Sequence, residues 1–137
     1  MKPHQEIAVN AAHEYFKHAS RGKLIMACGT GKTFTSLKIA EREANGLALV
    51  LVPSIALVGQ ILREWSAQSE QPINSICVCS DPKISQSRKQ VGVDFDNFST
   101  IDLTVPATTN PITVVEQYKR FRNGNLTVIF LHINQSK

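Results

Sequence analysis

The stretch that decides the fold reads Leu24-Ile25-Met26-Ala27-Cys28-Gly29-Thr30-Gly31-Lys32-Thr33. A short apolar run ends in a glycine-containing loop, and the loop opens a helical pattern that continues to Ala44. The first N–H groups of a helix have no partner within the helix, and the helix dipole adds partial positive charge there. A strand, a loop and a helix N-terminus in this order therefore predict a cradle for phosphate groups.

The residue types of the loop fit the binding of a nucleoside triphosphate. Gly29 and Gly31 allow a sharp turn and a close backbone approach to the ligand, because neither carries a Cβ atom. Lys32 can reach the β- and γ-phosphates, and the Thr33 hydroxyl can hold Mg²⁺, so we expect these two residues to be catalytic in a complete enzyme. The nucleotide-binding residues expected in the loop are Cys28, Gly29, Thr30, Gly31, Lys32, Thr33 and Phe34. In the strict form of this motif the first residue is glycine, where this chain has Met26.

Composition is that of an ordinary globular domain. The chain has 137 residues, of which 42% are hydrophobic and 19% charged, and this length favours one domain with a real core. The net charge of +4 is compatible with a polyanionic partner but is too small to indicate one. No apolar run approaches the ~18 residues of a membrane span, and no signal segment follows Met1, so we expect a cytoplasmic protein without membrane contact.

Three cysteines, Cys28, Cys77 and Cys79, bear on metal binding and redox compartment. Cys77 and Cys79 lie in an apolar stretch, where a period of two puts both side chains on one face of a strand. Their spacing is poor for zinc and no cluster of further ligands follows, so buried thiols are favoured over a metal site. Cys28 lies inside the phosphate loop, where it could be oxidised. We interpret this set as typical of a reducing compartment.

Strand and helix patterns alternate along the chain. Apolar periodicity and turn residues predict strands over 23–27, 47–52, 75–79 and 127–133, and helices over 4–19, 32–44, from Ser54 through Trp65, and 111–122. This alternation predicts a three-layer α/β fold with a mainly parallel sheet, with phosphates bound at the carboxyl ends of the strands.

Three details of this pattern are specific enough to be checked. The unbroken apolar run 47–52 predicts a strand covered on both faces. The predicted apolar stripes of the first and last helices consist of Ile7, Ala8, Ala11, Ala12, Phe16 and Ala19, and of Val114, Val115, Tyr118 and Phe121. Residues 80–110 are irregular, and the basic residues there (Lys83, Arg88 and Lys89) are either a solvated surface or a nucleic-acid contact.

Several stretches in a fixed order resemble the first RecA-like lobe of superfamily 2 helicases and translocases. The form is most similar to the motor domains of restriction enzymes related to the type ISP class, a branch in which Met often stands at the first position of the phosphate loop. The stretches are Pro3-His4-Gln5, Met26 to Thr33, and Leu51-Val52-Pro53-Ser54 with the residues to Gln60. Asp102-Leu103 and Pro106 to Thr109 also resemble this branch, as does Val128-Ile129-Phe130, after which the similarity decays.

The resemblance implies specific roles for residues outside the loop. Gln5 would read adenine, which suits an amide because it offers both a donor and an acceptor. Pro53 and Ser54 would lie where the lobe touches a nucleic-acid backbone. It further implies a RecA-like P-loop fold, ATP and Mg²⁺ as ligands, DNA as the partner of the complete protein, and a place in restriction-modification.

An acidic motif expected for hydrolysis is missing from the chain. The resemblance implies an Asp-Glu-x-His motif after a later strand, and no Asp-Glu pair occurs in the 137 residues; Asp94 is the nearest substitute. We therefore expect residues 1–137 to be a partial N-terminal RecA-like helicase ATP-binding domain, incomplete at its C-terminal side and inactive alone. We also expect an exposed edge at the first strand, with self-association as a consequence.

Two other functions stay open at this point. The first is a self-contained small P-loop kinase or nucleotide hydrolase, which would need its own acid and basic lid, with Arg88, Lys89 and Asp94 as candidates. The second is a non-catalytic, degenerate fragment that binds nucleotide. Turnover by the 137 residues would favour the first, and binding without turnover would favour the second.

Overall fold

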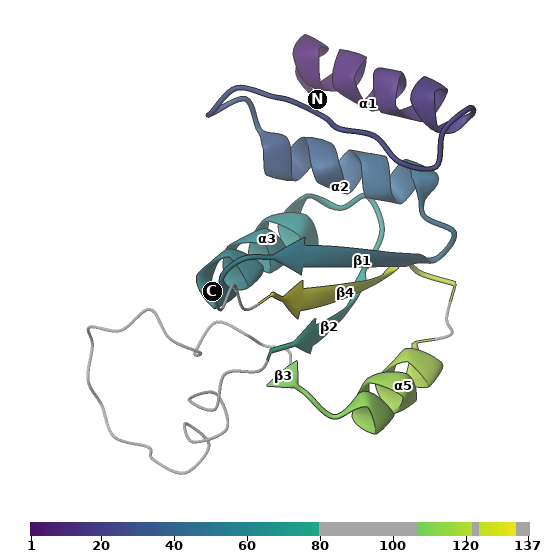
Figure 1. Cartoon of the computed structure of the whole chain (residues 1–137), viewed down its shortest axis with the longest axis vertical. Coiled ribbons are helices and arrows are strands. Elements are labelled where there is room, and N and C mark those ends of the chain that lie inside the picture. Colours follow the sequence, from purple (N-terminus) through teal and green to yellow (C-terminus); the bar gives the residue numbers. More distant parts are fainter. Residues whose placement is uncertain (80–106, 122–123, 134–137) are drawn as a thin grey trace, which may run out of the picture.

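A four-stranded parallel sheet forms the centre of the molecule. In the computed structural model, which describes residues 1–79, 107–121 and 124–133, the strand order is β1-β4-β2-β3 and every neighbouring pair is parallel (Figure 1). The strands are β1 (Leu47–Val52), β4 (Thr127–His132), β2 (Asn74–Val78) and β3 (Ala107–Thr108). The α/β fold with a parallel sheet is confirmed.

Two of the described helices, the third and the last, begin at residues whose side chains cap them. The described helices are α1 (Pro3–Phe16), α2 (Lys32–Glu43), α3 (Ile55–Gln68) and α5 (Pro111–Arg120). Ser54 Oγ accepts a hydrogen bond from the Leu57 N–H (3.3 Å), and Asn110 Oδ1 accepts one from the Ile112 N–H (2.9 Å). Both caps satisfy donors at the helix start that would otherwise be unpaired, and both predicted starts are confirmed.

Helices lie on both faces of the sheet. Helix α3 leads from β1 to β2 across β4, whereas α5 leads back from β3 to β4 in the opposite direction. Because parallel crossovers are right-handed, these two helices occupy opposite faces, which gives three layers. The core lies on the α3 side, where Trp65 packs edge-to-face on Phe130 at 5.8 Å between ring centroids. Helix α2 packs on α3, and α1 packs in turn on α2 (Figure 1).

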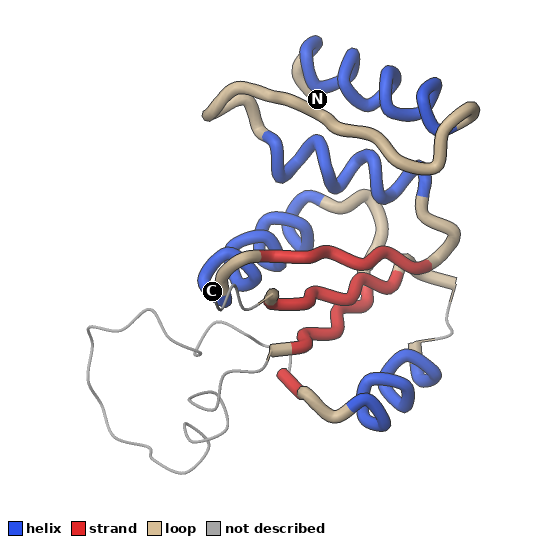
Figure 2. The backbone as a smooth tube through the Cα atoms, in the orientation of Figure 1, coloured by secondary structure: helices blue, strands red, loops and turns tan. Residues whose placement is uncertain are grey.

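The predicted strand 23–27 is wrong. This segment is an extended loop that runs past α1 and α2, and none of the described strands pairs with it (Figure 2). Leu24 and Ile25 are 48% and 84% exposed. The apolar run has strand-like composition, but a strand forms only where a neighbouring strand supplies its hydrogen-bond partners.

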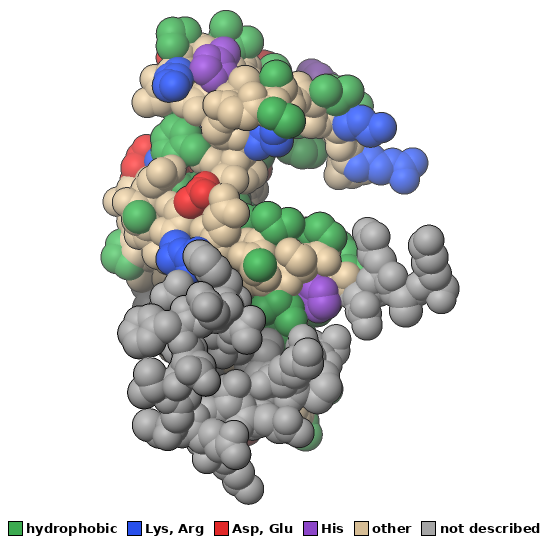
Figure 3. Space-filling model, turned by 90° about the vertical axis from the view of Figure 1, so that its left-hand side faces the viewer, with side chains coloured by type: hydrophobic (Ala, Val, Ile, Leu, Met, Phe, Trp, Pro, Cys, Tyr) green, Lys and Arg blue, Asp and Glu red, His purple; other side chains and the backbone are tan. Residues whose placement is uncertain are grey.

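The prediction that β1 is covered on both faces is also wrong. The side chains of Leu47, Leu49 and Leu51 are 42%, 60% and 54% exposed, whereas Val52 is buried. β1 is an edge strand of the described sheet, and the leucines point to the face opposite α3. Figure 3 shows the molecule hollowed on one side, with hydrophobic side chains along the lower rim of the hollow.

In the first and last helices, α1 and α5, the residues that are buried differ from the apolar stripes predicted from the sequence. In α1, Gln5 and Val9 are buried against α2, while Ile7 is 70% exposed and Phe16 is 40% exposed. The reason is that polar side chains, rather than the apolar stripe, dock α1: His13 bonds Glu43 and Asn10 bonds Arg42, each at 2.7 Å. In α5, Val115 and Tyr118 are exposed, and Val114 and Phe121 are partly buried.

Several predicted features lie outside the described residues. They all fall between residues 80 and 106, and they are the irregular segment itself and the residues singled out in it: Lys83, Arg88, Lys89, Asp94 and Asp102-Leu103. Within the described segments, no helix combines the length and the apolar character needed to cross a membrane.

Candidate functional site

The phosphate loop has the backbone conformation that its glycines predict. Gly29 and Gly31 adopt φ values of +75° and +81°, and Gly31 is the N-cap of α2. Residues with a side chain rarely adopt this left-handed conformation, so the loop requires glycine at both places. The first turn of α2, with Lys32 and Thr33, follows directly, so its N–H groups lie at the end of the loop.

One carbonyl group at the start of the loop receives two donors. Thr30 Oγ1 donates to Ala27 O at 2.7 Å, and Lys32 Nζ donates to the same oxygen at 3.1 Å. Both side-chain contacts are exposed to solvent. An exposed ammonium held by one neutral acceptor can move to a phosphate, because charge-assisted hydrogen bonds are the stronger kind.

Helix α1 is tied to the phosphate loop through Gln5. The Gln5 side chain is 6% exposed; its Nε2 donates to Thr30 O at 3.1 Å, and its Oε1 accepts from the Lys2 N–H at 2.8 Å. His4 Nε2 lies 3.0 Å from the same Thr30 carbonyl and donates to it when that nitrogen carries a proton. An amide can make four hydrogen bonds, so these two leave Gln5 with capacity for a ligand.

Gly31 is also required by its neighbour. A Cβ atom built at Gly31 would fall well inside the contact distance of Gln5 Nε2. The Gln5 side chain therefore occupies the space that any other residue at position 31 would need. Gln5 and Gly31, which the sequence analysis both assigned to the nucleotide site, are thus in direct contact although they are 26 positions apart in the chain.

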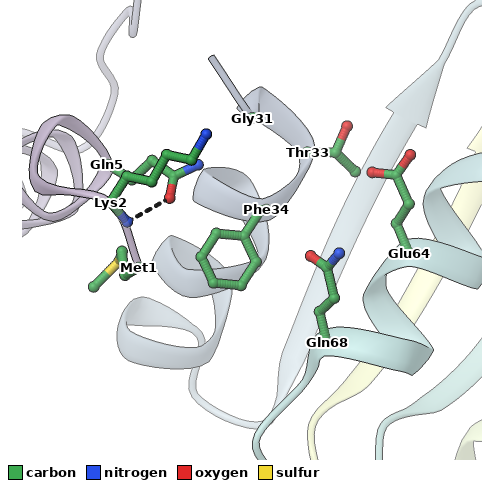
Figure 4. A pocket seen from close by; sticks show the side chains of 8 residues that line it. All are labelled: Met1, Lys2, Gln5, Gly31, Thr33, Phe34, Glu64 and Gln68. Carbon is green, nitrogen blue, oxygen red and sulfur yellow. Dashed lines mark hydrogen bonds between the residues drawn. The ribbon is translucent and has the colours of Figure 1, made fainter. Parts of the chain in front are cut away.

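A pocket of about 500 Å³ opens beside the loop (Figure 4). Its volume is within the range of small-molecule sites. Three elements supply the lining: the start of α1, the start of α2 and the second half of α3. The lining residues are Met1, Lys2, Gln5, Gly31, Thr33, Phe34, Glu64 and Gln68. The structure thus gathers Gln5, Gly31, Thr33 and Phe34, as the sequence predicted for a nucleotide site, whereas Pro53 and Ser54 lie elsewhere, after β1.

The first turn of α2 is anchored to the core by a tryptophan. Trp65, 2% exposed, donates from Nε1 to Thr33 O at 3.0 Å and packs on Phe130 of the sheet. Ser36 Oγ donates to the same carbonyl at 2.8 Å. Apolar periodicity indicates that the Trp65 side chain faces inward, but it does not indicate what the polar Nε1 atom of the ring meets.

Three other residues that line the pocket were not predicted from the sequence. Lys2, Glu64 and Gln68 line the pocket, and they carry no motif that would single them out. The hydrogen bond between Lys2 and Gln5 has the spacing of a capping box, but that pattern is recognised by Ser or Thr at the N-cap, where this chain has Lys.

The cysteines differ in exposure. Cys28 is exposed in the phosphate loop, and Cys77 and Cys79 are buried, as predicted. Burial, with a smaller contribution from Cys79, raises the pKa of Cys77 to about 12. The Cys77 thiol is therefore protonated at neutral pH and unreactive.

The donor set fits Mg²⁺ bound together with phosphate rather than a metal held by protein alone. Among the described residues, no cluster of three or more His, Cys, Asp and Glu side chains gathers as a metal site. Thr33 lines the pocket and contributes one hydroxyl oxygen, and Glu64 brings a carboxylate to the facing wall (Figure 4). Mg²⁺ commonly takes one or two protein oxygens and completes its shell with phosphate oxygens and water.

Comparison with known proteins gives one family and consistent structural neighbours. The family model described as "Type III restriction enzyme, res subunit" matches residues 1–131. A nuclease-deletion mutant of the type ISP restriction-modification enzyme LlaGI, in complex with a DNA substrate mimic, is similar, with 36% identity and a TM-score of 0.73. The ATP-dependent type ISP restriction-modification enzyme LlaBIII, bound to DNA, is similar with 33% identity and a TM-score of 0.74.

Each similarity covers 96% of this chain, which spans only 12% of the LlaGI chain and 8% of the LlaBIII chain. No curated protein matches the sequence.

Proposed function

Because the chain belongs to the family of the type III restriction enzyme res subunit, we propose that residues 1–137 form part of the ATP-binding, RecA-like lobe of a restriction-enzyme DNA motor. The observation that carries the proposal is the phosphate loop with its pocket: two left-handed glycines, an exposed Lys32 and the Thr33 hydroxyl stand beside the buried Gln5 amide. The similar enzyme LlaBIII is itself described as ATP-dependent and DNA-bound.

Each group has a role in holding Mg-ATP. The N–H groups of residues from Cys28 to Phe34 would bind phosphate oxygens, and Lys32 would leave Ala27 O for the β- and γ-phosphates. Thr33 would bind Mg²⁺, which neutralises phosphate charge when it is present. Gln5 would use its remaining donor and acceptor for the adenine edge.

Lys32→Ala tests this assignment. Removing the ammonium removes charge-assisted hydrogen bonds worth about 1.5–3 kcal/mol, so the affinity for Mg-ATP should fall at least tenfold. Ligand at ~100 Kd should stabilise the wild-type chain by about 2.7 kcal/mol in a thermal-shift titration, and the same concentration should stabilise the variant by about 1.4 kcal/mol or less. Lys119→Ala on α5 is the matched control and should behave as wild type. Equal shifts for Lys32→Ala and wild type would refute the proposal.

Binding and turnover are separable for this chain. We expect the 137 residues to bind Mg-ATP without sustained hydrolysis, since no Asp-Glu pair is present to position Mg²⁺ and the attacking water. Measurable turnover that depends on Lys32 would instead favour a self-contained kinase or hydrolase. A phosphate-release assay with the Lys32→Ala chain as the blank distinguishes the two.

Two partner interactions are part of the proposal. Ser54 caps α3 as an acceptor, which leaves its hydroxyl hydrogen to donate to a DNA phosphate, with Pro53 at the adjacent turn.

Self-association would use the β1 edge, where Leu47, Leu49 and Leu51 are exposed, rather than the segment 23–27. Sedimentation at two protein concentrations tests it, and a monomer at both would exclude it.

A further inference from the structure

One aromatic residue forms a wall of the pocket. Phe34, partly buried, lies between the start of α1 with Met1, Lys2 and Gln5 and the α3 residues Glu64 and Gln68 (Figure 4). It follows Thr33 directly in the first turn of α2, so it is close to the phosphate loop. An aromatic face that lines a cavity of this size is a surface on which a flat ring can stack.

The ring has a cation over one face. Lys38 Nζ lies 5.5 Å from the centroid of the Phe34 ring, one helical turn further along α2. Lys38 is not among the residues that line the pocket. A cation at this distance is attracted to the ring face and holds it in place.

The ammonium is itself fixed by two carboxylates. Lys38 Nζ lies 2.7 Å from Glu41 Oε2 and 2.8 Å from Glu70 Oε1, and the lysine side chain is only 11% exposed. Glu41 Oε1 also accepts from the Glu70 N–H at 2.9 Å, which joins α2 to the end of α3. Partial burial alone would lower the pKa of Lys38, but the hydrogen bonds to Glu41 and Glu70 outweigh it and raise the pKa, so the lysine stays charged.

We propose that Phe34 is the stacking platform for the base of the bound nucleotide, and that Lys38 is a positioning residue that holds the Phe34 ring in place. This inference rests on the proposed nucleotide-binding function and assigns the base end of the same site. Phe34 would provide the face for a purine ring, and Gln5 would provide hydrogen bonds to its edge. Stacking on an aromatic side chain contributes about 1–3 kcal/mol, or about 5- to 150-fold, to the affinity for a base.

The test compares ATP with inorganic tripolyphosphate, which carries the phosphates but no base. Both are titrated with Mg²⁺ into the wild-type chain by calorimetry. Phe34→Leu should weaken ATP binding about tenfold and leave tripolyphosphate binding within about twofold. Tyr118→Leu, which removes an exposed aromatic ring on α5, is the matched control and should change neither affinity.

Two further pairs of measurements separate positioning from stability. Phe34→Tyr should restore ATP affinity, since it keeps the ring. Lys38→Met should weaken ATP about threefold without changing tripolyphosphate, and Lys38→Arg should restore it because guanidinium also binds over an aromatic face. A purely structural role for Lys38 would lower both affinities together with the melting temperature.

The outcomes distinguish this inference from the function on which it rests. Equal loss of ATP and tripolyphosphate binding in Phe34→Leu, or no loss of either, would overturn the stacking role. Equal affinity of the wild-type chain for the two ligands would also overturn it while leaving the phosphate cradle intact. Failure of the wild-type chain to bind either ligand would refute the cradle itself.

Discussion

The side-chain amide of Gln5 fills the space beside Gly31 in which a Cβ atom would have to lie. Gly31 is left-handed (φ +81°), and Gln5 is fixed by hydrogen bonds to Thr30 O and the Lys2 N–H. One glycine therefore meets two demands, a turn of the phosphate loop and contact with α1. The start of α1 and the loop are a single unit although 25 residues separate Gln5 from Thr30.

Gly31→Ala should destabilise the chain and weaken Mg-ATP. The left-handed backbone costs about 1–2 kcal/mol for a residue with a side chain. Displacing Gln5 adds about 1 kcal/mol for each hydrogen bond lost. Gly46→Ala is the matched control, because Gly46 has φ +80° and nothing within 4 Å of its Cβ position. Urea melts should show the larger loss for Gly31→Ala; equal losses would mean that Gln5 moves aside without cost.

Trp65→Phe should weaken the attachment of the first turn of α2 to the core. The substitution keeps an aromatic ring near Phe130 but removes the Nε1 donor to Thr33 O, which should cost about 1–2 kcal/mol in the free energy of unfolding. Ser36→Ala removes the other donor to the same carbonyl at an exposed position and should cost less. Denaturant midpoints measure both. A larger effect of Ser36→Ala would contradict the anchoring role.

Cysteine labelling should separate the loop from the core. Cys28 is exposed, whereas Cys77 and Cys79 are buried and the pKa of Cys77 is raised to about 12, so iodoacetamide at pH 7.5 should modify one thiol per native chain. All three should react in denaturant. Mg-ATP should slow labelling of Cys28 if the loop binds phosphate, and mass spectrometry of the labelled peptides reads out each site. Rapid native labelling of Cys77 would show that the core opens.

Ser54→Asp should weaken DNA binding without destabilising α3. Aspartate caps a helix about as well as serine, so the melting temperature should stay near that of the wild-type chain, but its charge repels a phosphate. Ser54→Ala makes the opposite change: it costs about 1 kcal/mol of stability and adds no charge. Fluorescence anisotropy with a DNA duplex at low salt compares the three chains. Unchanged binding by Ser54→Asp would exclude a phosphate contact there.

The sequence predicts elements better than it predicts their partners. Local signals found β1, and the caps Ser54 and Asn110 gave the starts of α3 and α5, because propensity and capping act within a few residues. The segment 23–27 failed for the opposite reason: its composition suits a strand, but only neighbours in space decide whether a strand forms. Exposure of Leu49 on β1 likewise depends on which helix covers the face.

The residues of the candidate site fall into the same two groups: those that a local motif predicts, and those that only the fold brings together. Gly31, Lys32 and Thr33 follow from a motif whose chemistry is local, and the structure gives the loop the expected conformation. Trp65 and Gln68 come from α3, and Glu70, which pairs with Lys38, follows α3; only the fold brings them to α2. The two residues of such a contact lie up to 32 positions apart in the chain, and no pattern in a single sequence records a pair of this kind.

Helix α1 has few apolar anchors: Val9 is its one buried hydrophobic side chain, and polar pairs such as His13 with Glu43 make up much of its contact with α2. Such a segment opens locally at a lower free-energy cost than a sheet does, and its amide hydrogens exchange with solvent early. A ligand that bridges Gln5 and the phosphate loop closes this local opening. Deuterium uptake between Pro3 and Phe16 would then slow on binding, while uptake in β4 would stay as it was.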